Sequence, residues 1–502
     1  MAEQEFRVNA SSHHEATDVV VAVDQGTGST KAIALDFHGR VVARSSVPVS
    51  RNDPRPGWVE QDALEIRDSV LTAMASLVDQ RPLNVTAIGL SNQRESAVVW
   101  DRQTGEPLGP MLGWQDRRTT ERATAAYEEG WGHEVRSRTG LPLDPMFSAL
   151  KLGWLLDQAD PDRTGCRSGR IAVGTVDSWL LFSLTGEHRI EIGNASRTQL
   201  LNLERAQWDA GLAERFGIPE QALPEIVASD QVSGPLKALS SLPRETRIYA
   251  VLGDSHAALY ANGVREPGRV KATYGTGSSV IALSGTAPAP GDGGLVQTIA
   301  WSTGSPAYAL EGTILSTGST LIWLSELFGT DPYGLSRLAA SAPPNSGLDL
   351  VPAFSGLGAP YWDPQAKAII SGFGLGTSQA EIARAAFESI ALQTEDVLAE
   401  VARAAGKPVT DVLVDGGPAQ NDWLAQLQAD LSQQEILRNN VAELSAIGAA
   451  HLAGVARGFW TELECEAFTR DRTAFVPLVT AEEARARREQ WAHAVRRSRL
   501  TS

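Results

Sequence analysis

Cysteine is almost absent from this sequence: Cys166 and Cys465 are the only two among 502 residues. Two cysteines far apart in the chain provide neither a disulfide framework nor the closely spaced pairs of a structural metal site. A reducing compartment, the cytoplasm, is therefore the expected location.

Long apolar runs are also missing. No segment approaches the roughly 20 apolar residues that a membrane-spanning helix needs, and the opening MAEQEFRVNASSHHEATD lacks the apolar centre of a signal peptide. We expect no membrane partner, and we expect residues 1–17 to form a polar tail.

Basic residues are outnumbered by acidic ones. Lys and Arg total 44 against 60 Asp and Glu, which gives a formal net charge of −16. Nucleic-acid binding favours a basic surface, so this balance argues against a nucleic-acid partner. An acidic protein that handles a phosphate compound needs local positive charge or a cation such as Mg²⁺.

The chain is long enough for two domains. At 502 residues it exceeds the size of a single core, and a content of 42% hydrophobic and 21% charged residues predicts a large folded interior. Strands alternate with amphipathic helices, as where the helical stretch 378–406 precedes the strand 411–417, which places the fold in the α/β class. We expect the domains to be 18–248 and 249–502.

One glycine-rich stretch, DQGTGSTK at residues 24–31, lies between the apolar runs VVVAV and AIALDF. It matches neither a Walker-type loop nor a dinucleotide fingerprint, because one residue separates its glycines and a lysine stands where a third glycine is needed. The alternating residues on both sides predict a β-hairpin with this stretch at its tip. Its backbone amides suit an anion and Asp24 suits a cation beside it, as in Mg-nucleotide. An ordinary polar turn is the alternative.

The same pattern recurs in the second half, where YGTGSSVIALS occupies residues 274–284. Two strand–GTGS–strand units this far apart predict two related domains with a cleft between them, each with a hairpin facing phosphate. Between them, RIYAVLGDSHAALYANG (247–263) reads as a strand that ends at Gly253 and Asp254 and leads into a helix. We expect the domain boundary just before this strand.

Polar residues that interrupt or end predicted strands are the candidates for chemistry. Asp254 ends a strand, where open α/β sheets hold their ligands, and its carboxylate suits a general base that accepts a hydroxyl proton. A helix N-cap is the alternative. Arg94 and Glu95 offer donors and acceptors for neighbouring hydroxyls if a turn or bulge brings both to one side, or they belong to a solvated hairpin. Trp114 offers a flat face to a polyol, or a core contact.

These segments belong to longer motifs. In chain order they are VDQGTGSTKA, PGWVEQD, IGLSNQRES, GWQDRR, GTVDSWL, NASRT, TYGTGS, VPAFSGLGAPYWDP and VDGGPAQND. With MFSALKLGWLLDQ (146–158) and AIISGFGLGTSQAEIARAAFE (368–388), they resemble the FGGY carbohydrate kinases over about residues 18–500, and among these most resemble the glycerol kinases. The resemblance implies two actin-like (ribonuclease H-like) ATPase domains with a cleft between them.

The resemblance also implies roles for single residues. Asp24 would help to hold Mg²⁺, and Asp254 would be the catalytic base. The ATP phosphates would be faced by Thr27, Gly28, Ser29 and Lys31. From the second domain, the nucleotide would be lined by Thr276 and Gly318. Near adenosine would lie Gly417 and Asn421. The acceptor would contact Arg94, Glu95, Trp114 and Asp254.

Three acceptor positions depart from the glycerol kinase pattern. Met146 stands where a Tyr is expected, Ser255 where a Gln is expected and Ser279 where a Phe is expected. A buried polar contact left unpaired costs about 1–3 kcal/mol, or one to two powers of ten in glycerol binding. The pocket is therefore expected to be wider and more polar at one end. Ile322 replaces a Gln near the nucleotide base, which leaves base selectivity open.

The expected function is transfer of the γ-phosphoryl group of ATP, with Mg²⁺, to a primary hydroxyl, converting glycerol to glycerol 3-phosphate. A larger polyol such as erythritol, threitol or a pentitol is the alternative acceptor. A remote alternative is a non-catalytic, nucleotide-gated binding protein on the same fold. Besides a small polyol, the expected partner is a further copy of the chain, in a dimer or tetramer.

Overall fold

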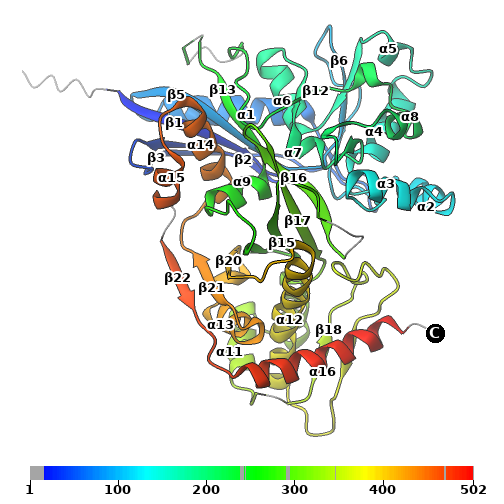
Figure 1. The fold of residues 1–502 in the computed structure, drawn as a ribbon, viewed down its shortest axis with the longest axis vertical. Coiled ribbons are helices and arrows are strands. Elements are labelled where there is room, and N and C mark those ends of the chain that lie inside the picture. Colours follow the sequence, from blue (N-terminus) through cyan, green and yellow to red (C-terminus); the bar gives the residue numbers. More distant parts are fainter. Residues whose placement is uncertain are drawn as a thin grey trace, which may run out of the picture.

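The computed structural model describes residues 16–237, 242–243, 245–289, 294–344, 346–468 and 471–500. They form two lobes, each built on a mixed sheet with helices on both faces (Figure 1). The two-domain α/β architecture expected from the sequence is confirmed. The polar tail expected at residues 1–17 lies outside the described residues up to position 15, and Thr17 already belongs to the first strand.

A five-stranded sheet organises the first lobe. β13, β5 and β1 run parallel, and β2 and β3 extend the sheet as antiparallel strands. Alternate residues of β1 face opposite layers, because Val19 and Val21 share a core with α1 (Ala63–Val78) and α6 (Val176–Thr185) whereas Val20 faces the other way. In sheet order the strands are β13 (Ile248–Gly253), β5 (Leu83–Asn92), β1 (Thr17–Gln25), β2 (Ser29–Asp36) and β3 (Val41–Pro48).

A seven-stranded sheet organises the second lobe. Its antiparallel hairpin β14–β15 runs beside the parallel strand β20, just as the hairpin β1–β2 runs beside β5. The two GTGS stretches are thus the tips of matching hairpins, as the sequence predicted. In sheet order the strands are β16 (Val296–Ser302), β17 (Pro306–Ile314), β15 (Ser278–Gly285), β14 (Arg269–Tyr274), β20 (Asp411–Asp415), β21 (Glu435–Asn439) and β22 (Arg472–Phe475).

Two helices lie between the sheets of the two lobes. α9 (Asp254–Ala261) and α14 (Leu444–Arg457) share one apolar core with strands of both sheets. The two helices meet backbone to backbone, because a Cβ at Gly448 would lie 1.8 Å from the Ala257 carbonyl oxygen. Only glycine permits this approach, so the position of α9 depends on a segment near the far end of the chain.

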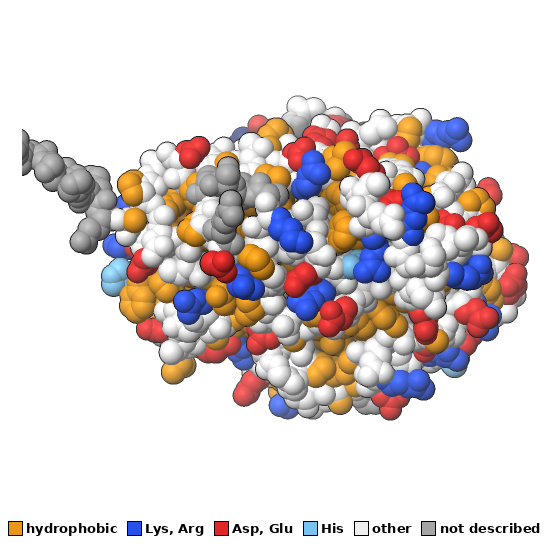
Figure 2. Space-filling view, turned by 90° about the horizontal axis from the view of Figure 1, so that it is seen from above, with side chains coloured by type: hydrophobic (Ala, Val, Ile, Leu, Met, Phe, Trp, Pro, Cys, Tyr) orange, Lys and Arg blue, Asp and Glu red, His pale blue; other side chains and the backbone are white. Residues whose placement is uncertain are grey.

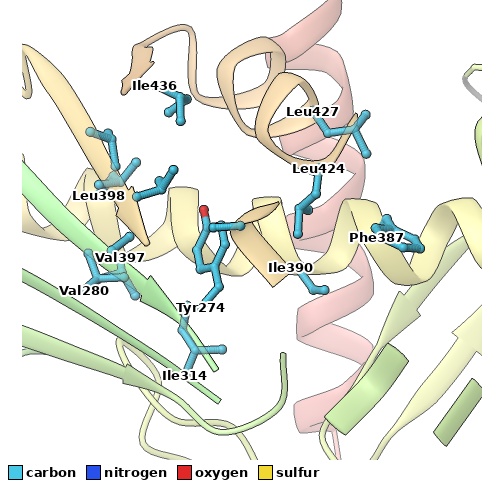
Figure 3. Packing of buried hydrophobic residues seen from close by; sticks show 14 of the residues in the cluster. Tyr274, Val280, Ile314, Phe387, Ile390, Val397, Leu398, Leu424, Leu427 and Ile436 are labelled. Carbon is cyan, nitrogen blue, oxygen red and sulfur yellow. The ribbon is translucent and has the colours of Figure 1, made fainter. Parts of the chain in front are cut away.

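The long helix α12 (Gln379–Ala405) covers the opposite face of the second sheet. It begins at a capping box, in which Ser378 and Glu381 exchange hydrogen bonds, and it ends at Gly406 with a φ of +63°. Its apolar side, including Phe387, packs against the second sheet and α13 (Figure 3). The other helices of this lobe are α10 (Gly318–Phe328), α11 (Pro332–Ala340), α13 (Asp422–Ser432), α15 (Glu462–Phe468) and α16 (Ala481–Arg499).

Short elements complete both lobes. In the first lobe they are β4 (Glu60–Gln61), β6 (Val98–Asp101), β7 (Met111–Leu112), α2 (Thr120–Glu128), α3 (Trp131–Thr139), α4 (Ser148–Ala159), α5 (Thr164–Arg167), β8 (Ile171–Gly174), β9 (Arg189–Glu191), α7 (Ile192–Ala195), β10 (Leu201–Asn202), β11 (Gln207–Trp208), α8 (Ala210–Arg215), η1 (Glu220–Ala222) and β12 (Glu225–Val227). In the second lobe they are β18 (Asp349–Val351), β19 (Ile369–Ser371) and η2 (Pro418–Gln420).

The pairing of the strands places the domain boundary later in the chain than the sequence predicted. Residues 248 and 249 open β13, which pairs with β5 inside the first sheet, so a boundary there would divide one sheet. α9 follows β13 directly, and the second sheet begins at Arg269. We therefore propose the link between α9 and β14 as the boundary.

The surface carries charges of both signs. On the face shown in Figure 2, basic side chains are interspersed with acidic and uncharged ones. This mixture differs from the continuous basic surface that nucleic-acid binding favours. Within the described part of the chain, no helix is both long enough and apolar enough to cross a membrane.

Candidate active site

A cleft of about 510 Å³ opens between the lobes. Carboxylates and lysines from both sheets line it, together with backbone of the loops after β20 and β21. The lining residues include Asp24, Lys31, Asp254, Ser255, Lys271, Thr273, Asp415, Gly416, Gly417, Gln420, Asn439 and Glu443. The cleft expected between the two GTGS domains is therefore present, and it brings together residues more than 200 positions apart in the chain, such as Asp24 and Asp254.

The hairpin β1–β2 borders this cleft through Asp24 and Lys31, which lie on either side of its tip. The Gly26 amide donates to the Ser29 carbonyl at 3.0 Å, which closes the turn. Above Gly28 there is open space, since a Cβ there would meet no atom within 4 Å. Asp24 and Lys31 face each other across the hairpin register and both reach the cleft. The tip therefore offers a backbone amide surface flanked by one anion and one cation.

Asp24 is held in place by a neighbouring strand. The Ser91 hydroxyl donates to its Oδ1 at 2.8 Å. Burial raises the pKa of this carboxyl to about 6, against the opposing effects of the Ser91 hydrogen bond and of Lys31.

Asp254 occupies the carboxyl end of β13, as the sequence predicted. It is the first residue of α9, with Gly253 as the N-cap, and its side chain is 39% exposed to the cleft. The Ser255 amide donates to its Oδ1 at 2.6 Å, and the Arg94 Nε lies 3.3 Å from the same oxygen. Burial raises the pKa of Asp254 while Arg94 opposes that shift. The carboxylate is therefore only partly engaged by the protein.

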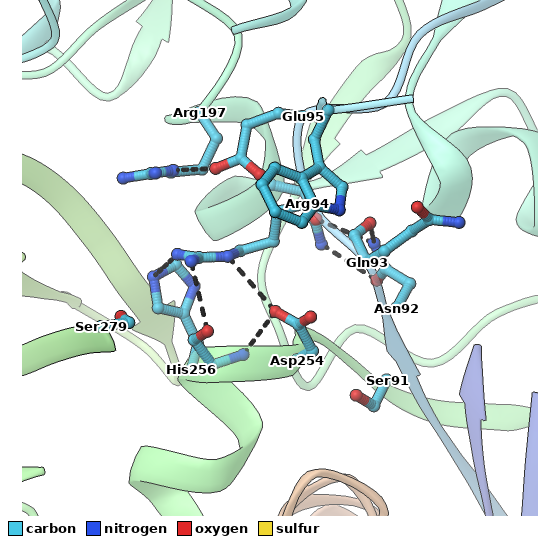
Figure 4. A network of polar contacts seen from close by, with 12 residues as sticks. Ser91, Asn92, Gln93, Arg94, Glu95, Arg197, Asp254, His256 and Ser279 are labelled. Carbon is cyan, nitrogen blue, oxygen red and sulfur yellow. Dashed lines mark hydrogen bonds and ion pairs between the residues drawn. The ribbon is translucent and has the colours of Figure 1, made fainter. Parts of the chain in front are cut away.

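Arg94 and Glu95 lie in the bend between β5 and β6. Glu95 has a φ of +63°, a left-handed conformation that breaks strand alternation and turns both side chains into one buried network (Figure 4). This is the turn that the functional interpretation of these two residues required. The network joins Arg94, Glu95, Arg197, Asp254, Ser255, His256, Ser279 and Glu311.

Every N–H of Arg94 has a protein partner. Nη1 and Nη2 donate to the two carboxylate oxygens of Glu311 at 3.0 and 2.9 Å. The remaining N–H groups face Ser255 Oγ at 3.2 Å, His256 Nε2 at 3.4 Å and Asp254 at 3.3 Å. A guanidinium has five donors, so all of them are used. An acceptor hydroxyl that binds Arg94 therefore has to share or replace one of these contacts.

Sequence reasoning missed Glu311 and Arg197 as site residues. Arg197 lies just after α7, and its Nε donates to Glu95 at 2.5 Å while its Nη1 lies 2.9 Å from Glu311. Two signals were available in the sequence. Arg197 is the arginine of NASRT, and Glu311 is a lone carboxylate inside the apolar strand AYALEGTI.

The other acceptor candidates are placed around this network. Trp114 Nε1 donates to Thr27 Oγ1 at 3.1 Å, which ties the predicted substrate wall to the hairpin tip. Ser279 donates to Glu311 Oε1 at 2.9 Å. Met146 is only partly buried, and its carbonyl accepts from the buried Lys151 at 2.5 Å. The three positions that depart from the glycerol kinase pattern are therefore all partly open to solvent, since Ser255 and Ser279 are also only partly buried.

The second hairpin tip meets the start of α10. The Gly318 amide donates to the Gly275 carbonyl at 2.9 Å, and the Thr276 carbonyl accepts from Thr317 and Ser319. Among the nucleotide candidates, Lys31 and Gly417 line the cleft volume. The candidates that do not line it are Thr27, Gly28, Ser29, Thr276, Gly318 and Asn421. Asn421 caps α13 and donates to Ser336 at 2.7 Å, and Ile322 is 52% exposed on α10.

A divalent cation fits this site in one way only. In the part of the chain that the structure describes, no three His, Cys, Asp or Glu side chains are arranged to enclose a metal. Asp24 and Asp254 nevertheless face one cleft. Mg²⁺ favours one or two carboxylates together with phosphate oxygens and water, so the residues present fit Mg-nucleotide better than a free ion.

Two family comparisons cover nearly all of this architecture. Residues 19–260 match the N-terminal domain, and residues 270–457 the C-terminal domain, of the FGGY family of carbohydrate kinases. This chain belongs to the FGGY family of carbohydrate kinases. The two matched ranges of this FGGY kinase leave out residues 261–269, which contain the link between α9 and β14, where strand pairing also divides the lobes.

Individual FGGY kinases match over almost their full length. An apulose kinase of Pectobacterium atrosepticum is 41% identical, covering 96% of this chain and 99% of that protein. A glycerol kinase of Paraburkholderia xenovorans is 40% identical, covering 95% and 97%. The crystal structure of Plasmodium falciparum glycerol kinase with ADP has a TM-score of 0.92 at 28% identity, covering 97% and 99%. The relatives' names differ in the acceptor, so membership of the family identifies a carbohydrate or polyol kinase without identifying its acceptor.

Proposed function

We propose that this protein transfers the γ-phosphoryl group of ATP to a primary hydroxyl of glycerol, forming glycerol 3-phosphate. The observation that carries the proposal is the placement of Asp254: a partly engaged carboxylate at the end of β13, in the same cleft as Asp24 and Lys31. A carboxylate that accepts the hydroxyl proton has to stand opposite the group that binds phosphate, and this cleft provides both.

The chemical step uses Asp254 as general base. Its carboxylate takes the proton of the primary hydroxyl, the hydroxyl oxygen bonds to the γ-phosphorus, and the bond from that phosphorus to the bridging oxygen of ADP breaks. Arg94 orients Asp254 through the 3.3 Å contact between its Nε and Oδ1. Positioning and charge neutralisation then supply most of the rate.

The nucleotide would span both hairpin tips. We assign the phosphates to Thr27, Gly28, Ser29 and Lys31, with Thr276 and Gly318 on the second lobe and Gly417 and Asn421 towards adenosine. Asp24 would hold Mg²⁺, directly or through water, and the bound ion would neutralise charge on the phosphates. The ADP in the Plasmodium falciparum glycerol kinase structure supports a nucleotide site in this fold.

A larger acceptor is the second candidate, and Ser279 favours it. This hydroxyl, bound to the buried Glu311, stands where an aromatic wall is expected in glycerol kinases, so that side of the site is smaller in side-chain volume and more polar. The similarity to an apulose kinase points the same way. Erythritol, threitol, a pentitol or, from the name of that relative, apulose would then replace glycerol in the same reaction.

A panel of acceptors tests both candidates. ADP formation is measured with Mg-ATP and glycerol, erythritol, threitol, ribitol, dihydroxyacetone or apulose, and kcat/KM is compared. We expect turnover with at least one, and the highest value identifies the acceptor class. Ser279→Phe restores the expected aromatic wall and should raise the ratio of glycerol to larger acceptors about tenfold or more. ADP formation that no acceptor stimulates would contradict the proposal and favour a nucleotide-gated binding protein.

The pH dependence follows from the two cleft carboxylates. Asp24 and Asp254 both act ionised, and burial raises the pKa of Asp24 to about 6 and that of Asp254 above its usual 3.8. A raised pKa means that protonation sets in at a higher pH than for a free aspartate, so function is lost as the pH falls. We expect kcat/KM to be level at neutral pH, to fall below about pH 6 as Asp24 takes up a proton, and to fall more steeply at the lower pH where Asp254 is protonated as well. A profile that stays level down to the ordinary aspartate range would contradict this assignment.

Two further expectations stay predictions. Assembly into a dimer or tetramer needs a measurement of mass in solution. A cytoplasmic location agrees with the two buried, unpaired cysteines, which burial keeps protonated by raising the pKa of each thiol to about 12.

A further inference from the structure

Glu311 is the most enclosed acid of the polar network. It lies in the middle of β17, and its side chain is 2% exposed. Both oxygens accept from Arg94, Oε1 also accepts from Ser279 at 2.9 Å, and Oε2 lies 2.9 Å from Arg197 Nη1. Two arginines hold the pKa of this carboxyl well below its usual range, so it is ionised at neutral pH.

This carboxylate connects the two lobes. Arg94 and Arg197 come from the first lobe, whereas Glu311 and Ser279 come from strands of the second sheet. Charges alternate along the chain of contacts, because Arg197 also pairs with Glu95. Removing ions from water is costly unless each finds an opposite charge, so this arrangement forms only when the lobes are docked as seen here.

Glu311 also decides how Arg94 faces Asp254. A guanidinium binds a carboxylate most strongly through two parallel N–H groups. Glu311 takes both Nη atoms in that way, and only the Nε edge is left for Asp254, at 3.3 Å. Without Glu311, the Nη atoms would be free to pair with Asp254 and occupy the oxygens that the acceptor hydroxyl needs.

We propose that Glu311 is a positioning residue of the phosphoryl-transfer site: it holds Arg94 in the orientation that leaves Asp254 available, and it ties that orientation to the docking of the two lobes. The inference rests on the proposed function, because it assigns Asp254 as the base. Glu311 itself is too enclosed to touch the acceptor.

The test compares two buried carboxylates. Glu311→Gln keeps the shape of the side chain and removes its charge. The matched control is Glu388→Gln in α12, where Glu388 pairs with Arg384 and Arg487 at 2.7 and 2.8 Å and its side chain is 9% exposed. Glu388 lies outside the cleft lining and outside the Arg94 network. Both variants remove one buried charge from an arginine pair.

We expect Glu311→Gln to lower kcat for the best acceptor about 10- to 100-fold, with KM for ATP within about twofold of wild type. Both Gln variants should lower the melting temperature by a similar amount, because each removes one buried charge from an arginine pair. Glu388→Gln should leave kcat within about twofold of wild type. Glu311→Asp keeps the charge and should recover part of the loss. Equal kcat in Glu311→Gln and wild type would overturn the proposal, as would equal losses in the two Gln variants.

Two outcomes separate this inference from the proposed function. If wild type forms no ADP with any acceptor, the proposed function fails and the inference fails with it. If wild type is active and the losses of kcat in the Glu311 variants are explained by their lowered melting temperatures alone, only the inference fails. Should Glu311→Gln not fold, Ser279→Ala removes one hydrogen bond to Glu311 Oε1 without leaving a buried charge unpaired. It should then lower kcat about threefold or more, and unchanged kcat would overturn the proposal.

Discussion

Asp254→Asn should lower turnover by about 10²–10⁴-fold while Mg-ATP still binds with nearly unchanged affinity. The amide has the size of the carboxylate and keeps one acceptor oxygen for the Ser255 amide, so α9 should begin as before. It cannot take the hydroxyl proton, which leaves only positioning and charge neutralisation. Single-turnover ADP formation measures the loss, and a nucleotide titration measures the binding.

The matched control for this prediction is Asp68→Asn. Asp68 lies on α1, exposed, and pairs with its neighbour Arg67, so the same chemical change there should alter turnover by less than about twofold. Turnover by Asp254→Asn at the wild-type rate would remove Asp254 from the mechanism.

Arg94→Met should combine the largest loss of stability with loss of activity. Of the two arginines that pair with Glu311 in the described part of the chain, it leaves Arg197, in a setting where the Glu311 side chain is 2% exposed. Breaking a buried ion pair by removing one partner costs about 3–5 kcal/mol. Acceptor turnover should disappear as well, because Asp254 loses the group that orients it. Thermal unfolding and ADP formation are measured on the same preparation.

The double variant Arg94→Met/Glu311→Met separates these two effects. It removes both charges and leaves Arg197 paired with Glu95 at 2.5 Å, so most of the lost stability should return. Activity should stay absent. A double variant as unstable as Arg94→Met alone would show that packing, and not the weakened charge pairing of Glu311, accounts for the loss.

The local features of the site were predictable from the sequence because each depends on a short, contiguous stretch of residues. Strand alternation around a glycine-rich turn specifies a hairpin, and both GTGS hairpins formed as expected. Asp254 follows an apolar strand directly, so its place at the edge of a sheet needed no tertiary information. The capping box at Ser378 and Glu381 marks the start of α12 in the same way.

Long-range pairings were not predictable in this way. Glu311 lies 217 positions from Arg94, and nothing in the strand AYALEGTI says which arginine it meets. The boundary expected at residue 248 was misplaced for a related reason. A buried parallel strand has the same apolar pattern in either sheet, and only its pairing with β5 assigns β13 to the first lobe.

The packing of α14 has a consequence for how the molecule is made. One face of the first sheet is covered by a helix that is synthesised almost 200 residues after β13. During translation the face of the first sheet that α14 covers is therefore made long before α14, and only the short helix α9, which follows β13 directly, can pack on it earlier. The surroundings of Asp254 are complete only after the carboxyl-terminal segment has been made, because α14 residues line the same cleft, and a prematurely terminated chain would expose part of that apolar face.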